Sequence, residues 1–221
     1  MQINPGSMLP QRRPLPVIVL ADTSTSMEGV KINTLNSALS EMNSKLSDLH
    51  DTRGQIHLGV VTFATNAQQV LPITPIENVI MPTLSASGMT AMGAAFQMTC
   101  DILEDENQLP KRAWSPTIVL VSDGLPNDEW QEPLQRLLDS PRGKRAVRVA
   151  IGIGEDCDFD LLKAFINHPE VPVFRADQVE KITDFFRFVT FSVMSRSTAK
   201  DPNSAHLPLH LLDKDNDDLE F

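Results

Sequence analysis

The sequence predicts a doubly wound α/β fold, with a mostly parallel six-stranded sheet, one antiparallel edge strand and helices on both faces. Short apolar runs rich in β-branched residues, such as 17–21 (VIVLA) and 117–121 (TIVLV), are typical of strands buried on both faces. Between such runs lie segments whose apolar residues recur every three or four positions, as in amphipathic helices. This alternation favours right-handed crossovers and a parallel sheet.

Each predicted element follows from one of these two patterns. Apolar residues spaced from Ile32 to Leu49 predict a long helix after the first strand, and 55–63 predicts the second strand. Residues 65–66 are too short a link for a crossover, so 67–73 is predicted to be antiparallel and at the edge, giving the strand order 3-2-1-4-5-6. The other predicted elements are a helical turn near 76–79, helices over 92–103, 130–138, 161–165 and 182–193, and strands at 117–121, 146–153 and 172–174.

Length and composition are those of one globular domain with short extensions. The chain has 221 residues, of which 41% are hydrophobic, enough for a substantial core. We expect a loose N-terminal lead-in over residues 1–13, one domain over 14–196 and an acidic, flexible tail over 197–221. The tail has no periodic apolar face, so folding is expected not to depend on it.

The charge of the chain argues against two classes of partner. A formal charge of −10 and a pI near 4.9 disfavour binding to nucleic acid or to an anionic membrane surface. No stretch has the pattern of an export signal or the length of a membrane span, so a cytoplasmic location is expected. In that compartment Cys100 and Cys157 are expected to be reduced core residues.

A polar corner follows the first strand directly. Asp22, Ser24 and Ser26 occupy alternate positions after the run 17–21, at the carboxyl end where open α/β sheets bind ligands. One carboxylate and two hydroxyls without Cys or His suit a hard cation such as Mg²⁺, Mn²⁺ or Ca²⁺. The alternative is that these residues cap the next helix, a common role for Asp and Ser.

A second buried strand, 117–121, also ends in a polar corner, with Asp123 in the sequence S-D-G. Between the two corners lies a loop of small residues that carries Thr90 in S-G-M-T. In this order and spacing, the region 14–196 resembles the von Willebrand factor type A (VWA) family with its metal-ion-dependent adhesion site. The resemblance implies a Rossmann-like VWA fold and one metal site with the ligands Asp22, Ser24, Ser26, Thr90 and Asp123.

The resemblance also implies what such a site does. In the family, an Asp or Glu of a partner protein completes the coordination of the metal, so we expect a metal-dependent protein-interaction module. The opening segment 12–29 is similar to bacterial tellurite-resistance VWA proteins of the TerY type. That similarity implies a cytoplasmic stress-response complex with a kinase or phosphatase as partner.

Two enzymatic alternatives are weaker. A Mg²⁺-dependent phosphatase or phosphotransferase would also place Asp22 at the end of the first strand, but it needs a second aspartate where Ser24 stands. A dinucleotide loop at 152–154 lacks the third glycine of the motif, and Glu155 and Asp156 would repel a pyrophosphate. We therefore expect no catalytic residues and no nucleotide cofactor.

Overall fold

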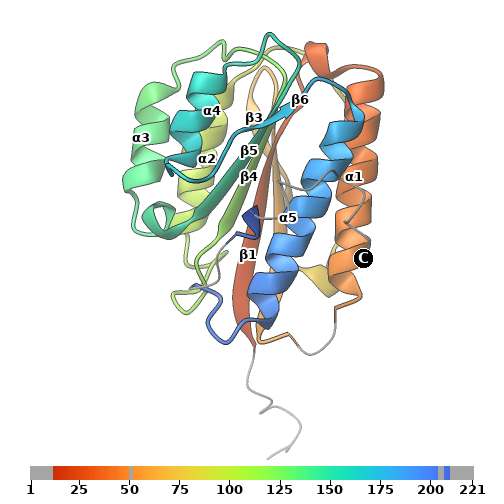
Figure 1. The fold of residues 1–221 in the computed structure, drawn as a ribbon. Helices are drawn as coiled ribbons and strands as arrows, with labels where there is room; N and C mark the ends of the chain where they lie inside the picture. The colour runs from red at the N-terminus through yellow and green to blue at the C-terminus, as the bar shows by residue number, and fades with distance from the viewer. Residues whose placement is uncertain (1–11, 50–51, 204–206, 210–221) are drawn as a thin grey trace, which may run out of the picture.

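One six-stranded sheet runs through the centre of the molecule (Figure 1). The computed structural model describes residues 12–49, 52–203 and 207–209. The strand order is β3-β2-β1-β4-β5-β6, and every neighbouring pair is parallel except β2 with β3. The predicted order and the predicted antiparallel edge strand are both confirmed. The strands are β1 (Arg13–Asp22), β2 (Gly54–Phe63), β3 (Ala67–Pro75), β4 (Thr117–Ser122), β5 (Val147–Ile153) and β6 (Phe174–Ala176).

Helices cover both faces of the sheet, as Figure 1 shows. One layer consists of α1 (Val30–Ser47) and α5 (Glu180–Thr198), and the other of α2 (Met92–Glu104), α3 (Gln131–Asp139) and α4 (Phe159–Ile166). Among the described residues, no helix is both long enough and apolar enough to span a bilayer. Short 3-10 turns also lie between the longer elements of the described chain, among them η2 (Thr25–Met27), η3 (Ile76–Asn78) and η4 (Gly143–Arg145).

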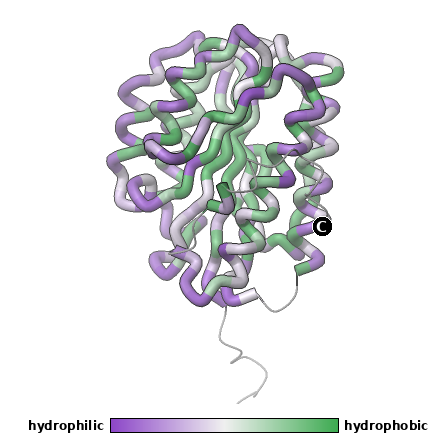
Figure 2. Tube along the Cα trace, in the orientation of Figure 1, coloured by the Kyte–Doolittle hydropathy of each residue, from purple (hydrophilic) through white to green (hydrophobic). Residues whose placement is uncertain are grey.

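The central strand β1 separates two hydrophobic cores. Val17 and Val19 belong to the core under α1 and α5, whereas Ile18 and Leu20 belong to the core under α2, α3 and α4. Side chains alternate between the two faces of a strand, so an unbroken apolar run is what a doubly covered strand requires. Figure 2 shows the result, with hydrophobic strands inside and hydrophilic residues on the outer helix surfaces.

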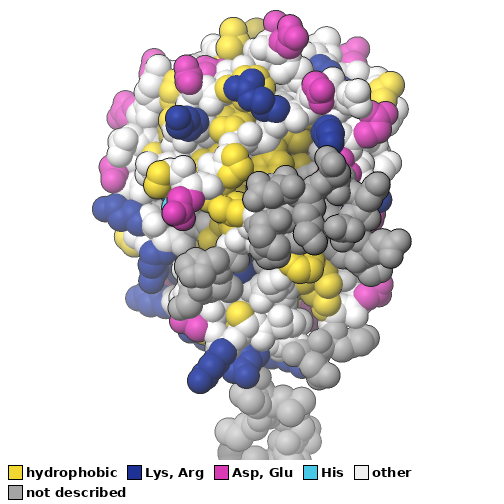
Figure 3. All heavy atoms as spheres, in the orientation of Figure 1, with side chains coloured by type: hydrophobic (Ala, Val, Ile, Leu, Met, Phe, Trp, Pro, Cys, Tyr) yellow, Lys and Arg dark blue, Asp and Glu magenta, His cyan; other side chains and the backbone are white. Residues whose placement is uncertain are grey.

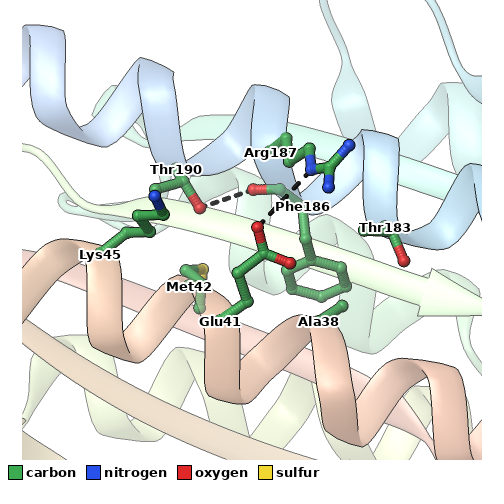
Figure 4. Close-up of a pocket in the computed structure, with 8 residues that line it drawn as sticks. All are labelled: Ala38, Glu41, Met42, Lys45, Thr183, Phe186, Arg187 and Thr190. Atoms are coloured by element: carbon green, nitrogen blue, oxygen red, sulfur yellow. Dashed lines mark hydrogen bonds and ion pairs between the residues drawn. The ribbon is translucent and has the colours of Figure 1, made fainter. Parts of the chain in front are cut away.

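The seam between α1 and α5 is closely packed (Figure 4). The Phe186 ring of α5 lies over Ala38 and Met42 of α1, and Arg187 reaches Glu41 with a nitrogen–oxygen distance of 3.6 Å. The cavity left between these side chains measures about 10 Å³, roughly the size of one water. This contact is therefore structural and offers no ligand site.

The last strand lies two residues later than the predicted 172–174. Strand β6 begins at Phe174, which pairs with Ile151 of β5. Pro172 lacks the N–H group needed for a sheet ladder, which explains the later start. The Phe174 ring is held by Phe185 and Phe188 of α5, with ring centroids 4.9 and 5.0 Å away.

Residues beyond Arg196 contact the domain. The buried Arg196 side chain donates hydrogen bonds to Pro202 O at 3.1 Å and to Ser115 O at 2.7 Å, and the Ser115 N–H donates to Asn203 Oδ1 at 2.9 Å. Leu207 and Leu209 pack against the core. The boundary at 196 stays a prediction, but these contacts favour a later one. The predicted loose lead-in up to residue 11 and the acidic run 213–220 lie outside the described residues.

We expect a chain that ends at Arg196 to melt about 5 °C below the full chain, because two or three hydrogen bonds are worth about 2 kcal/mol together. A chain that ends at Leu209 keeps these contacts and should melt with the full chain. Circular dichroism melts of the three chains compare them directly. Equal midpoints for all three would restore the original expectation that folding does not depend on residues after 196.

Candidate metal centre

Two polar corners meet because their strands are neighbours. Strands β1 and β4 are parallel, and Ala21 pairs with Val121. The residues that follow each strand, Asp22 on one side and Ser122 and Asp123 on the other, therefore lie at the same edge of the sheet. The loop before α2, which carries Thr90, borders the same corner. Three loops thus surround the candidate site.

Asp22 is the most enclosed of the site residues. Its carboxylate is fully buried; Oδ1 accepts a hydrogen bond from the Ser24 N–H at 2.9 Å, and Oδ2 accepts one from the Ser122 hydroxyl at 2.6 Å. Burial raises the pKa of Asp22, and the charge of Asp123 raises it further, whereas the bonds from Ser122 and Ser24 lower it. The net direction is upward, so a negative charge here is not fully compensated by its protein neighbours. A nearby cation would stabilise it.

Ser24, Ser26 and Asp123 form a chain of oxygen atoms. The hydroxyl oxygens of Ser24 and Ser26 lie 2.9 Å apart, and the Ser26 hydroxyl donates to Asp123 Oδ1 at 2.7 Å. Adjacent ligands of an octahedral Mg²⁺ lie about 3 Å apart, because each is roughly 2.1 Å from the ion. The spacing and chemistry of these donors therefore fit a hard divalent cation.

The helix-cap alternative is not supported. Helix α1 has Gly29 as its N-cap, and Ser24, which precedes the short turn η2, makes no side-chain capping bond. The Ser24 hydroxyl contacts Ser26 instead. The polar residues after β1 thus face the adjoining loop and do not cap a helix.

In the described part of the chain, Thr90 is not hydrogen-bonded to the oxygen atoms of Ser24, Ser26 and Asp123, although its loop adjoins theirs. The loop before α2 is tied to the first loop, because the Thr25 N–H and hydroxyl both donate to Gly88 O, at 3.1 and 3.0 Å. The Thr90 N–H donates to Asn127 Oδ1 at 2.7 Å, and the Asn127 N–H donates back to Thr90 O at 3.0 Å. Within the described residues, no hydrogen bond joins the Thr90 hydroxyl to the other four predicted ligands. The structure thus links four of the five residues and fixes the backbone of the fifth.

Sequence reasoning missed three residues that shape the site. Ser122 holds Asp22, and Asn127 holds the backbone of Thr90. The Lys31 ammonium lies 2.6 Å from Asp123 Oδ2 and donates to Ser26 O at 3.2 Å. Ser122 directly precedes Asp123 and could have been found from the motif. Lys31 and Asn127 have no local signal, because Asp123 and Thr90, the site residues that their side chains contact, lie far away in the chain.

Asp128 fixes the same loop to α2. Its two carboxylate oxygens accept hydrogen bonds from the Gly93 N–H at 3.0 Å and the Ala94 N–H at 2.9 Å. These are free N–H groups of the first helical turn, where a negative charge is favourable. The contact holds the loop after β4 in place, and with it Asn127 and its partner Thr90.

Thiol ligands do not contribute to the site. Cys157 is free and buried, and its Sγ donates to Ser122 O at 3.5 Å. Burial raises its pKa to about 12, and the nearby charges of Asp123 and Asp22 act in the same direction. The thiol therefore stays protonated at neutral pH. Among the described residues, no three His, Cys, Asp or Glu side chains cluster closely enough to hold a metal without hydroxyl ligands.

The rim of the site is apolar. Val30, Met89 and Leu125 are 67%, 55% and 64% exposed, and each lies on or directly after one of the three loops. Ile80, at 88%, is the other strongly exposed large hydrophobic residue of the described chain. Figure 3 shows acidic, basic and hydrophobic side chains mixed on the upper half of the face it displays, the end at which the parallel strands finish. Large exposed apolar side chains thus adjoin the loops of the candidate site.

An open sheet with carboxylates and hydroxyls at the carboxyl ends of neighbouring strands defines the class of α/β proteins that bind ligands at this edge. A comparison with protein-family models matches residues 17–188 to the von Willebrand factor type A domain. The chain therefore belongs to the von Willebrand factor type A family. Domains of this family are typically metal-dependent protein-interaction modules. A comparison with curated protein sequences gives no significant match.

Solved structures share the fold at low sequence identity. A von Willebrand factor type A protein from Catenulispora acidiphila matches with a TM-score of 0.61 and 18% identity, covering 83% of this chain and 43% of that one. Proximal thread matrix protein 1 from the mussel byssus, with a zinc-occupied MIDAS motif, matches with a TM-score of 0.63 and 14% identity, over 82% and 48%. The ArnB paralog VWA2 from Sulfolobus acidocaldarius matches with a TM-score of 0.59 and 19% identity, over 80% and 45%. The chain thus spans less than half the length of these three proteins.

Proposed function

We propose that this chain is a metal-dependent protein-interaction module whose metal site consists of Asp22, Ser24, Ser26, Thr90 and Asp123. The ion is Mg²⁺, with Mn²⁺ or Ca²⁺ as substitutes, and the partner protein supplies an Asp or Glu carboxylate to it. The observation that carries this proposal is the chain of oxygen atoms from Ser24 through Ser26 to Asp123, next to the buried Asp22.

The residues of the site have separate roles in this function. Asp22 and Asp123 supply two negative charges, and the hydroxyls of Ser24, Ser26 and Thr90 supply neutral oxygen atoms. A divalent cation held by only two charged ligands remains electrophilic and attracts a further carboxylate. Ser122 keeps Asp22 oriented, since its hydroxyl donates to the Asp22 oxygen that the Ser24 N–H does not use.

The apolar rim supports a protein as the partner. Val30, Met89 and Leu125 expose large hydrophobic side chains around a polar centre, the arrangement expected where a partner covers the surface. The similarity of segment 12–29 to TerY-type proteins leads us to propose a bacterial cytoplasmic complex for stress response, such as tellurite resistance. A kinase or phosphatase of that system is the proposed partner.

Variants of the ligands test the proposal. Ser26→Ala removes a neutral ligand and Asp123→Ala removes a charged one, and neither is part of the sheet core. We expect Mn²⁺ affinity, measured by calorimetry, to fall about tenfold for Ser26→Ala and at least about a hundredfold for Asp123→Ala, because a charged ligand contributes more. Far-UV circular dichroism should remain that of the wild type.

Ser37→Ala is the matched control, since the Ser37 hydroxyl donates to Asn33 O of its own helix and, within the described residues, contacts none of the predicted ligands. It should bind Mn²⁺ as the wild type does. A pull-down from a bacterial lysate, with and without EDTA, extends the test to the partner. Wild-type metal affinity in both Ser26→Ala and Asp123→Ala would refute the site.

A further inference from the structure

Lys31 shares the Asp123 carboxylate with the chain of hydroxyls. Asp123 Oδ1 accepts the Ser26 hydroxyl at 2.7 Å, and Asp123 Oδ2 lies 2.6 Å from the Lys31 ammonium. The Asp123 side chain is fully buried, whereas that of Lys31 is 32% exposed. With one partner buried, the two charges attract each other more strongly than in a fully exposed pair, where water screens both. Any cation bound by Asp123 therefore has a second positive charge as its neighbour.

The position of Lys31 in its helix is unfavourable without this contact. Lys31 is the second residue of α1, and the first turn of a helix disfavours positive charge because its free N–H groups give a positive helix end. That turn contains no acidic residue to compensate. The Lys31 side chain also donates to Ser26 O, so it faces the site and not the solvent side of α1. The Lys31 ammonium thus contacts two residues of the candidate metal centre, Ser26 and Asp123.

We propose that Lys31 sets the net charge of the metal centre, so that it weakens binding of the cation and strengthens binding of the partner's carboxylate. This inference rests on the proposed function. Asp22 and Asp123 balance the charge of a divalent ion, which leaves the loaded site neutral, and Lys31 makes it positive by one charge. A positive site attracts an acidic group more strongly than a neutral one. Lys31 thus lowers the affinity of the site for the cation and raises the affinity of the loaded site for acidic partners.

Lys31→Met tests both effects, on the cation and on the carboxylate, because it removes the charge and retains the length of the side chain. By calorimetry at fixed pH and ionic strength, Mn²⁺ should bind about tenfold more tightly to Lys31→Met than to the wild type, since one repelling charge near the ion is lost. With both proteins saturated with Mn²⁺, binding of the probe N-acetylglutamate amide is followed by the paramagnetic broadening of its proton signals. The probe should bind roughly threefold more weakly to Lys31→Met.

Two variants serve as controls. Lys31→Arg keeps the charge and should match the wild type in both assays. Lys45→Met removes a charge from the last turn of the same helix, far from the site, and should change neither affinity. Circular dichroism in EDTA checks that each variant is folded.

Each outcome decides one question. If Lys31→Met binds Mn²⁺ no more tightly than the wild type, or if it binds the probe equally well, the inference is wrong while the metal site stands. If neither the wild type nor Lys31→Met binds Mn²⁺, the proposed function itself is wrong. Tighter Mn²⁺ binding combined with weaker probe binding supports both effects that we infer.

Discussion

Gly93→Ala is expected to destabilise the protein by about 3 kcal/mol, although alanine is the better helix former. A Cβ atom at position 93 would lie 2.1 Å from Glu129 O and 2.9 Å from Glu129 C, and both are backbone atoms. Neither can rotate away, so the loop after β4 must move. The higher helix preference of alanine contributes at most about 1 kcal/mol of stability. The clash is larger, so the net effect of Gly93→Ala is destabilising. The displacement would also strain the bonds that Asp128 accepts from Gly93 and Ala94.

Thermal melts in EDTA measure this effect without a contribution from metal. For a chain of this length, a loss of about 3 kcal/mol lowers the midpoint by about 9 °C. Gly124→Ala is the control, and it lies in the loop after β4 that Gly93→Ala would displace. A Cβ atom at position 124 would meet nothing closer than Ser26 Oγ at 3.9 Å. It should melt within about 2 °C of the wild type. A Gly93→Ala protein as stable as this control would show that the loop is free to move.

Arg196→Met is expected to lower the free energy of unfolding by about 3 kcal/mol, because it removes buried hydrogen bonds. The guanidinium group is buried and is held by three neutral acceptors, Pro202 O, Ser115 O and Thr117 Oγ1. Burial lowers the pKa of Arg196 to about 10, which shows how strongly the enclosure disfavours the charge. Methionine restores the apolar volume but leaves these acceptors without a donor, at about 1 kcal/mol or more each.

Urea unfolding at pH 7 gives this free energy directly. Arg187→Met, on the same helix, removes a half-exposed arginine whose ion pairs with Glu41 and Asp184 span 3.6 and 3.9 Å. Exposed pairs of this kind contribute between zero and about 1 kcal/mol, so this control should remain close to the wild type. If the two variants lose equal stability, the buried contacts of Arg196 contribute no more to the free energy of unfolding than the exposed ion pairs of Arg187.

Much of the fold and part of the site were predictable from local patterns. The apolar runs identified the buried strands, because a strand covered on both faces cannot alternate with polar residues. The short link at 65–66 determined that β3 is antiparallel, since a parallel neighbour needs a crossover. The predicted helix positions agree with the structure to within a few residues. That Asp22, Ser24 and Ser26 lie close together was predictable because the motif is continuous in sequence, and their role as ligands stays a prediction.

Only the tertiary structure decided which distant residues meet at the site. Asp123 reaches Ser26 because β4 lies beside β1, and Lys31 reaches Asp123 because η2 and Gly29 turn the chain back over the sheet edge. Arg196 likewise meets its backbone acceptors, Pro202 O and Ser115 O, only in the folded protein, because no pattern in the sequence predicts such side-chain-to-backbone hydrogen bonds. The sequence alone therefore determined the strands and their order, and it predicted the first three candidate ligands, through short-range regularities. The partners of the buried charges depended on long-range packing, because no local pattern distinguishes Lys31 or Arg196 from the other lysines and arginines of the chain.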